Sequence, residues 1–176
     1  MFDRILVAVD HTEASNSLVE RAITLAAATK AQVLLLHVLS PDEEGSPGMP
    51  IYPNLSYSPS LDEAVLEAYR KRWETFQQKN LSQLEAYVCR AQEHDVKAEH
   101  VQRPGSPGKI ICDVASSWNA DLILMGSHGR SGLSQLLLGS VSNYVTHHAP
   151  CSVMLARGNK VASEDTHAWY ETMIAQ

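Results

Sequence analysis

Four residues near the middle of the second half of this sequence have the types and spacing needed to bind an anion. Gly126, Gly129, Gly139 and Ser140 lie between a short apolar run, residues 121–125, and a helix-like run that begins at the next residue. A glycine-rich loop that leads from a strand into a helix offers backbone N–H groups and the positive end of the helix dipole to a phosphate. Glycine also lets the main chain approach a ligand closely. The segment therefore predicts a nucleotide-binding domain.

A carboxylate, Asp10, follows the first apolar run, residues 5–9. In an open α/β sheet, ligands bind beyond the carboxyl ends of the strands, at the point where the strand order reverses. If the first strand and the strand before Gly126 are neighbours at that point, both ends face one crevice. A carboxylate there suits a ribose hydroxyl or a metal-bound phosphate. The alternative is that Asp10 caps the helix that begins near Thr12 or Glu13.

Two other glycine-rich nucleotide-binding motifs, the P-loop and GxGxxG, are not present in this sequence. The pair Gly108-Lys109 is followed by Ile110, where a P-loop needs Ser or Thr, and Arg103 stands where its leading glycine belongs. A GxGxxG motif does not follow the first strand, where residues 10–13 read Asp-His-Thr-Glu. A P-loop NTPase and a dinucleotide-dependent oxidoreductase are therefore both disfavoured.

The histidines and cysteines do not predict a metal site. No His/Cys/Asp cluster has the spacing of zinc ligands. His37, in an apolar run, is expected to be a core group with its hydrogen bonds satisfied, and His128 in the glycine loop faces either a phosphate or its own neighbours. The three cysteines lack CxxC spacing and are expected to be buried, reduced thiols.

Composition narrows the class of protein. The chain has 176 residues, 44% of them hydrophobic, and a net charge of −6 from 14 basic and 20 acidic residues. Its most basic cluster is Arg70-Lys71-Arg72. This balance argues against a general binder of nucleic acid or anionic membranes. The sequence shows no signal-peptide pattern and no uncharged apolar run of about 18 residues, so we expect a cytoplasmic protein without a membrane span.

Hydrophobic periodicity sets the order of the expected elements. Five apolar strands are expected at residues 5–9, 32–38, 96–101, 121–125 and 151–156. Helical patterns separate them, ending with 108–118 and 140–148. This β-α alternation predicts one open, doubly wound, parallel five-stranded sheet with helices on both faces, an α/β (Rossmann-like) fold. The strand at 96–101 alternates in polarity and suits an edge position.

Two segments depart from this regular alternation. Residues 40–60 hold five of the eight prolines and are expected to form a long loop. The amphipathic pattern from about Leu61 to His94 predicts a long helix whose aromatic stripe packs in the core. That stripe comprises Leu66, Tyr69, Trp73, Phe76, Leu81, Leu84, Val88 and Ala91.

The spacing Gly126-x2-Gly129-x9-Gly139-Ser140 resembles the ATP-binding signature of the universal stress protein family. The endings Ala8-Val9-Asp10 and Leu36-His37-Val38 of the first two strands are also similar to that family. So are the run from Asp121 to Arg130 and the Ala149-Pro150 break before the last strand. The resemblance covers residues 1–157 and implies a single domain of the adenine nucleotide alpha hydrolase-like type. The tail, residues 158–176, lies outside it, as does the Pro-rich segment 40–60.

The resemblance also implies a role for each site residue. Asp10 would contact the ribose, beside Ala8 and Val9 at the adenosine end, and Val38 would present its backbone to the adenine edge. Met125 and Gly126 would pack near the sugar. The residues around the phosphates would be Gly129, Gly139, Ser140, Val141 and Ser142, and Arg130 is either a phosphate partner or a solvated loop residue.

Together with the resemblance, these features predict a stress-response protein that binds ATP, ADP or AMP as a sensor or switch, and they leave room for Mg²⁺ bound through the phosphates. The sequence lacks a Walker lysine and an obvious water-activating base, so any hydrolysis should be slow. The alternative is a protein-interaction module in which nucleotide is dispensable; a true hydrolase would need turnover well above ~1 s⁻¹. The resemblance implies a homodimer through the last strand, residues 151–156, an apolar edge that would otherwise be exposed.

Overall fold

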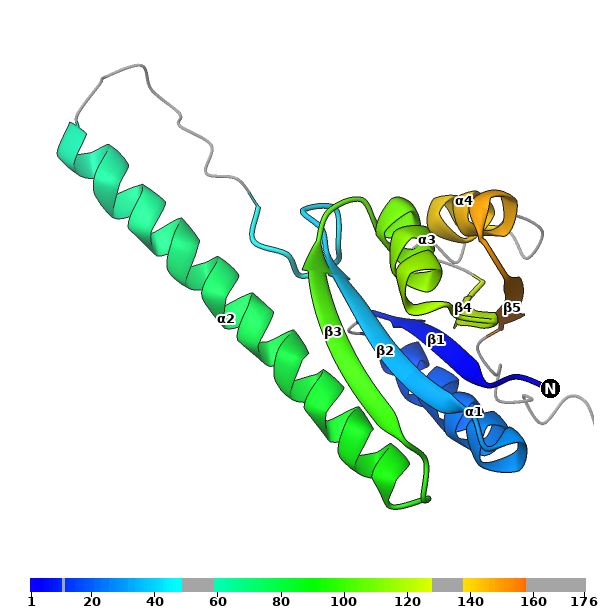
Figure 1. The fold of residues 1–176 in the computed structure, drawn as a ribbon. Coiled ribbons are helices and arrows are strands. Elements are labelled where there is room, and N and C mark those ends of the chain that lie inside the picture. The colour runs from blue at the N-terminus through cyan, green and yellow to red at the C-terminus, as the bar shows by residue number, and fades with distance from the viewer. Residues whose placement is uncertain (11, 49–58, 128–137, 158–176) are drawn as a thin grey trace, which may run out of the picture.

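The computed structural model describes residues 1–10, 12–48, 59–127 and 138–157, with side chains in the long helix described from residue 63 (Figure 1). Five parallel strands form one sheet in the order β3-β2-β1-β4-β5. The elements, in chain order, are β1 (Arg4–Val9), α1 (Glu13–Thr29), β2 (Gln32–Leu39), α2 (Pro59–Gln92), β3 (Ala98–Pro104), α3 (Pro107–Trp118), β4 (Leu122–Gly126), α4 (Ser140–His148) and β5 (Ser152–Ala156). The predicted α/β fold, with its parallel five-stranded sheet, is confirmed.

The central strand β1 explains why its sequence is a continuous apolar run. It pairs in parallel with β2 on one side and β4 on the other. Ile5, Leu6 and Val7 are fully buried because helices cover both faces of the sheet. Alternate side chains of each strand therefore enter two separate cores.

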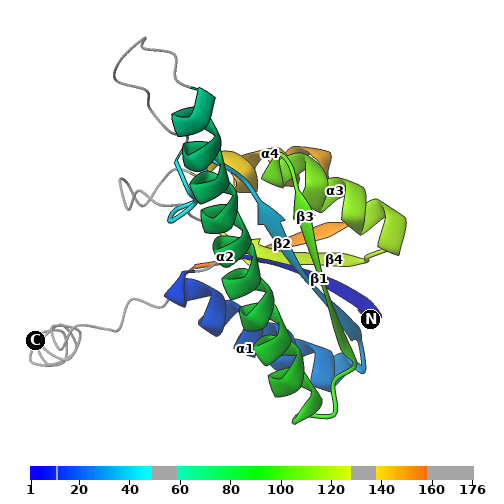
Figure 2. The same ribbon diagram turned by 90° about the vertical axis from the view of Figure 1, so that its left-hand side faces the viewer.

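The helices divide between the two faces of the sheet, as Figure 2 shows. One core joins the sheet to α1 and α2 through residues such as Leu18, Ala22 and Leu84. The other joins the sheet to α3 and α4 through residues such as Ile111 and Val145. The chain changes face between the helix that follows β1 and the helix that follows β4, which is the doubly wound arrangement.

Local signals mark the helix ends. Thr12 is the residue before α1, and Lys30 ends that helix in the left-handed region at φ 62°. Pro107 begins α3, where its missing N–H costs nothing, and Asn119 ends it at φ 54°. Ser106 is the residue before α3, and its side chain makes no capping hydrogen bond, although serine is a favoured residue at that position.

The long helix α2 corrects one prediction. Its last four turns pack in the core through Leu84, Tyr87 and Ala91. The earlier part of the expected stripe does not: Leu66 is 45% exposed, and Tyr69 and Trp73 are half-buried. Helical periodicity identified the face correctly, but the sheet ends before the helix does, so the outer turns of that face are not core.

The cysteines correct a second prediction, that all three thiols are buried. All three thiols are free, and Cys89 is exposed instead of buried, because it lies on the outer face of α2. Cys112 and Cys151 are half-buried, and burial is the main cause that raises the pKa of both thiols. Raised pKa values keep these two thiols protonated and unreactive. Among the helices that the structure describes, none is long and apolar enough to cross a bilayer.

Candidate nucleotide site

The strand order reverses between β1 and β4, and this point brings the two predicted groups together. Ala8 of β1 is in register with Met125 of β4. Asp10 and Ser127, each two residues further along, therefore come at the same level beyond the carboxyl edge. The chain leaves β1 toward α1 on one face and leaves β4 toward α4 on the other. A crevice at such a point is where open α/β sheets bind ligands.

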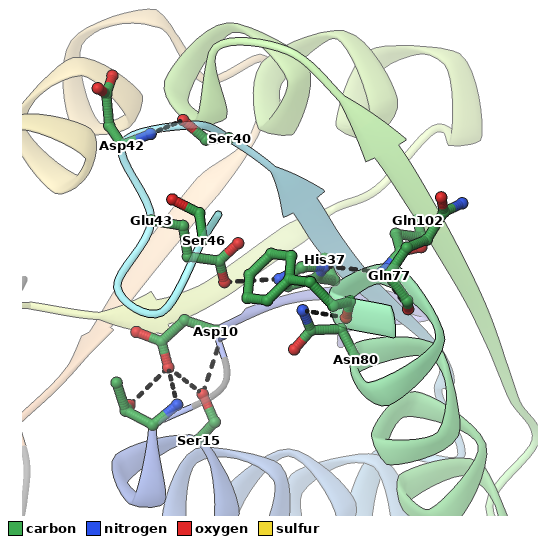
Figure 3. A network of polar contacts seen from close by, with 12 residues as sticks. Asp10, Ser15, His37, Ser40, Asp42, Glu43, Ser46, Gln77, Asn80 and Gln102 are labelled. Carbon is green, nitrogen blue, oxygen red and sulfur yellow. Dashed lines mark hydrogen bonds and ion pairs between the residues drawn. The ribbon is translucent and has the colours of Figure 1, made fainter. Parts of the chain in front are cut away.

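Asp10 is an exposed carboxylate held in a fixed orientation (Figure 3). Its Oδ1 atom accepts hydrogen bonds from the Thr12 N–H at 3.0 Å, from the Thr12 hydroxyl and from the Ser15 hydroxyl at 2.7 Å. Asp10 is not the residue that caps α1, since Thr12 stands at that position. Its carboxylate instead braces the start of α1 at the carboxyl edge of the sheet and remains exposed there, so the capping alternative is not what the structure shows.

The amino end of α4 lies against the end of β4. Gly139 is the residue before the helix, and its N–H donates to the carbonyl of Ser127 at 3.2 Å. The first N–H groups of a helix have no partner within it. In α4 these belong to Ser140, Val141 and Ser142, since the Asn143 N–H already bonds to the Gly139 carbonyl at 2.9 Å. The helix dipole favours an anion at this end.

Ser142 has a structural role that the sequence did not reveal. Its side chain is buried, and its hydroxyl donates to the Gly126 carbonyl at 2.9 Å. The hydroxyl proton therefore fixes α4 to β4, and what Ser142 offers to an anion is its backbone N–H. Ser140 is exposed at the first position of the helix, so it is accessible at the carboxyl edge of the sheet.

The remaining described residues of the predicted site form apolar walls. Val9, Val38 and Met125 are each less than 10% exposed, and Ala8 is half-buried. The Val38 side chain belongs to the core on the α3 and α4 side. The part of Val38 left for a ligand at the edge is its backbone, and the contact with adenine that the resemblance implies stays a prediction. Gly129 and Arg130, like His128, lie outside the described residues.

A buried cluster next to this edge was only partly foreseen. His37 of β2 is 2% exposed, which confirms its prediction as a satisfied core group. Its Nε2 atom lies 2.7 Å from Oε1 of Glu43, and its Nδ1 atom lies 3.1 Å from the amide nitrogen of Gln102 on β3 (Figure 3). The same amide nitrogen donates to the Gln77 carbonyl of α2 at 3.4 Å. We refer to His37, Glu43 and Gln102 as the His37 clasp.

The hydrogen bonds of the His37 clasp determine which ring nitrogen of His37 carries the hydrogen. The Gln102 amide nitrogen faces a carbonyl, which can only accept, so this nitrogen donates to both of its partners. His37 must then accept at Nδ1 and carry its proton on Nε2, from which it donates to Glu43. The clasp ties the segment after β2 to the edge strand β3 and to α2. Glu43 and Gln102 carried no recognisable signal in the sequence, because the fold alone brings them to His37.

Two other kinds of site are less well supported. Within the described ranges, no group of three or more His, Cys, Asp or Glu side chains could hold a metal ion. A surface pocket of about 420 Å³ lies at the opposite, amino edge of the sheet, lined by residues including Gln32, Lys97 and Trp118. It gathers none of the predicted residues, so the carboxyl edge remains the better candidate.

The strand order defines an open, doubly wound α/β domain with the candidate site at its switch point. The model of the universal stress protein family matches residues 1–157. The chain is 31% identical over 156 residues to Universal stress protein Sll1388 of Synechocystis, covering 89% of this chain and 98% of that one. This chain belongs to the universal stress protein family.

Solved structures agree on the fold. The hypothetical protein MJ0577 superposes with a TM-score of 0.69 at 21% identity, over 91% of this chain and 99% of that one. A family member from Arabidopsis thaliana with AMP bound gives 0.57 at 24% identity, covering 94% and 99% of the two chains. A universal stress protein in complex with cAMP gives 0.53 at 21% identity, covering 90% and 98%. These likenesses establish a shared architecture.

Proposed function

We propose that this protein binds an adenine nucleotide, with ATP as the expected ligand, and acts as a sensor or switch in a stress response. The observation that carries the proposal is the meeting of two features at the strand reversal. The braced carboxylate of Asp10 lies at the end of β1, and the amino end of α4 is fixed to the end of β4. Two solved family members, named as complexes with AMP and with cAMP, support an adenine nucleotide as the ligand class.

The described residues fit the parts of such a ligand. Asp10 would accept hydrogen bonds from the ribose hydroxyls, and the edge of Val38 would meet the base through its backbone. Gly139 and the N–H groups of Ser140, Val141 and Ser142 would hold phosphate oxygens, joined by Gly129 and Arg130 from the loop. Met125 and Gly126 would lie under the sugar, next to Ala8 and Val9. Mg²⁺ would enter with the phosphates.

Hydrolysis should be slow at most. Rapid phosphoryl transfer needs a metal, positioned positive charge and a group that orients the attacking water, all acting together. Among the described residues of the predicted site, Asp10 is the one with an ionisable side chain, and its Oδ1 atom is already engaged with Thr12 and Ser15. Turnover of ATP should therefore remain well below ~1 s⁻¹.

Equilibrium binding of labelled ATP to the wild-type chain and to a Gly139→Asp variant tests the proposal. Gly139 has φ −60° and ψ 157°, which any residue adopts, and aspartate is a favoured residue before a helix. The variant should therefore keep its fold. Its added carboxylate would repel phosphate at the same place, so we expect ATP affinity to fall at least about tenfold, or ~1.4 kcal/mol.

A Gly139→Asn variant is the matched control, because asparagine has nearly the same shape and helix preference but no charge. We expect Asn to weaken binding much less than Asp, and the difference to shrink at high salt. If the wild-type chain shows no saturable binding of ATP with Mg²⁺ at millimolar nucleotide, the proposal fails. The nucleotide-independent interaction module then becomes the better hypothesis.

The proposal includes a cytoplasmic homodimer that pairs β5 with its copy. β5 is an edge strand of the sheet, and Met154 on it is 43% exposed. An apolar edge of this kind favours pairing with another strand. Sedimentation at micromolar concentration should give the mass of two chains, and Met154→Lys should shift the mass toward one.

A further inference from the structure

The outer turns of α2 form a helical surface that the sheet does not cover. Figures 1 and 2 show α2 continuing past the carboxyl edge of the sheet. On this part of the helix Leu66 is 45% exposed, and Tyr69, Trp73 and Phe76 are half-buried. The three aromatic rings pack edge to face, with centroids 6.3 Å and 5.7 Å apart. We refer to Leu66, Tyr69, Trp73 and Phe76 as the outer stripe.

The outer stripe continues the face of α2 that already packs on the sheet. Leu66 and Tyr69 precede Leu84 and Tyr87 by about five helical turns, so the members of each pair point in the same direction. Leu84 and Tyr87 are each 1% exposed in the core. An amphipathic face that continues beyond the sheet in this way offers a place where another element can bind.

The charges beside the stripe favour an acidic partner. Arg70, Lys71 and Arg72 are all exposed and lie between Tyr69 and Trp73 in the sequence. They form the most basic cluster of the chain, whose net charge is −6. At about 100° per residue, Arg70 and Arg72 flank the stripe on its two sides. Lys71 lies further round toward the opposite face, as do the exposed glutamates Glu63, Glu67 and Glu74. Aromatic rings flanked by two arginines suit a segment with apolar residues on one side and carboxylates on the other.

The carboxyl-terminal residues of the same chain have this composition. Trp169, Tyr170, Met173 and Ile174 recur at the spacing of one helical face. Residues 163–176 also contain three acidic residues and neither lysine nor arginine. We propose that residues 163–176 bind to the outer stripe of their own chain, with their apolar side chains against the aromatic rings and their carboxylates near Arg70–Arg72.

The lengths permit this contact. β5 ends at Ala156 on the carboxyl edge of the sheet, the edge beyond which α2 continues. The strand order puts β5 four strands from β3, or ~19 Å at the usual strand spacing. Twelve residues, 157–168, can span up to ~40 Å when extended. This length is enough for residues 163–176 to reach the outer stripe across the carboxyl edge of the sheet.

Hydrogen–deuterium exchange on the full chain, read in peptides from residues 63–79, tests the proposal without nucleotide. The comparison is between the wild-type chain and a Trp169→Ser/Met173→Ser variant, with Thr166→Ser/Thr172→Ser as the matched tail control. A tethered segment has a millimolar effective concentration, so a weakly binding tail should slow exchange in 63–79 by about tenfold. The Trp169→Ser/Met173→Ser variant should lose this protection, and the threonine control should keep it.

A charge exchange distinguishes contact from a general effect on the helix. Arg70→Glu/Arg72→Glu should abolish the protection, and adding Glu164→Lys/Asp165→Lys to the same chain should restore it. Equal exchange in the wild-type chain and the Trp169→Ser/Met173→Ser variant would overturn the proposal. So would protection that grows with protein concentration, because a second copy would then cover the stripe. Since nucleotide is absent, failure here leaves the proposed nucleotide site unaffected.

Discussion

The two ends of α2 carry similar residues on the same face but lie in different surroundings. Toward its carboxyl end, Leu84 and Tyr87 are each 1% exposed, against β2, β3 and α1. About five turns earlier, Leu66 is 45% exposed and Tyr69 half-buried. The contrast teaches that hydrophobic periodicity specifies which side chains share a face, whereas the extent of the sheet decides which of them become core.

Substituting one leucine at each end of α2 should give the largest difference in the free energy of unfolding. Leu84→Ala removes a fully buried side chain and should lower the free energy of unfolding by about 2–5 kcal/mol. Leu66→Ala removes a half-exposed side chain and should cost less than ~1 kcal/mol. Chemical denaturation of both variants measures the two values. Equal losses would mean that the outer stripe is as well packed as the core, contrary to its exposure.

The His37 clasp marks the point where α2 leaves the sheet, and breaking it should have the next largest effect. Glu43→Ala leaves the buried Nε2–H of His37 without the acceptor it now has at 2.7 Å. An unsatisfied buried donor costs about 1–3 kcal/mol, so stability should fall by that amount. Glu43→Gln keeps an oxygen that can accept from Nε2–H and should retain most of the stability. A loss as large in Gln as in Ala would contradict the assigned position of the proton.

Substitutions of two tyrosines compare the contribution of a hydroxyl group at the two ends of α2. The Tyr87 hydroxyl accepts from Gln83 at 2.7 Å and donates to Asn16 at 3.2 Å. Tyr87→Phe should therefore cost about 1 kcal/mol, and Tyr69→Phe close to nothing. Thermal unfolding of the two variants at neutral pH measures both effects.

Tyr87 should also make stability depend on alkaline pH. Burial is the main cause that raises the pKa of Tyr87 above its ordinary value of 10.0. The folded protein then holds this proton more tightly than the unfolded chain does, so the contribution is fully present below pH 10.0 and is lost as pH rises above it. Tyr87→Phe should flatten the fall in stability above that pH. An unchanged alkaline profile would assign the fall to other groups.

Substituting one arginine at each end of α2 should give the smallest difference in stability. Arg90 lies 2.9 Å from Glu20 in an ion pair whose side chains are 38% and 51% exposed. Exposed pairs contribute less than ~1 kcal/mol, and salt screens them. Arg90→Ala and Arg72→Ala should both change stability by less than ~0.5 kcal/mol, with the Arg90 effect vanishing at high salt. A larger loss at Arg90 would indicate that its guanidinium group over the Tyr87 ring, 5.7 Å from the ring centroid, matters more than the ion pair with Glu20.

The β-α order and the sheet could be predicted because each buried strand is an apolar run and each helix has a clear start. The helix Ser140–His148 has the predicted bounds, since Gly139 and Pro150 flank it. β3 was expected at residues 96–101 but spans Ala98–Pro104. Its length is set by pairing with β2, where Leu39 meets Pro104, and an edge strand tolerates proline.

Parts of the candidate site depend on contacts that no local pattern records. The glycines and Asp10 could be named as candidates because their types and spacing suit the binding of phosphates and sugars. The Ser142 hydroxyl bond to Gly126 and the His37–Glu43 contact join residues whose relation appears only in three dimensions. Composition likewise could not reveal that Cys89 is exposed, since that depends on which side of α2 meets the sheet.

Because α2 is long and packs on the sheet at one end only, a small rotation at that end displaces its other end by a larger distance. The helix is held firmly at its carboxyl end, and residues 63–77 extend ~21 Å beyond the last strongly held turns at the usual rise per residue. A rotation of about 5° at the fixed end would move the opposite tip by about 2 Å over that length. A spectroscopic label near Glu63 would thus magnify small rearrangements at the sheet edge into a displacement large enough to measure.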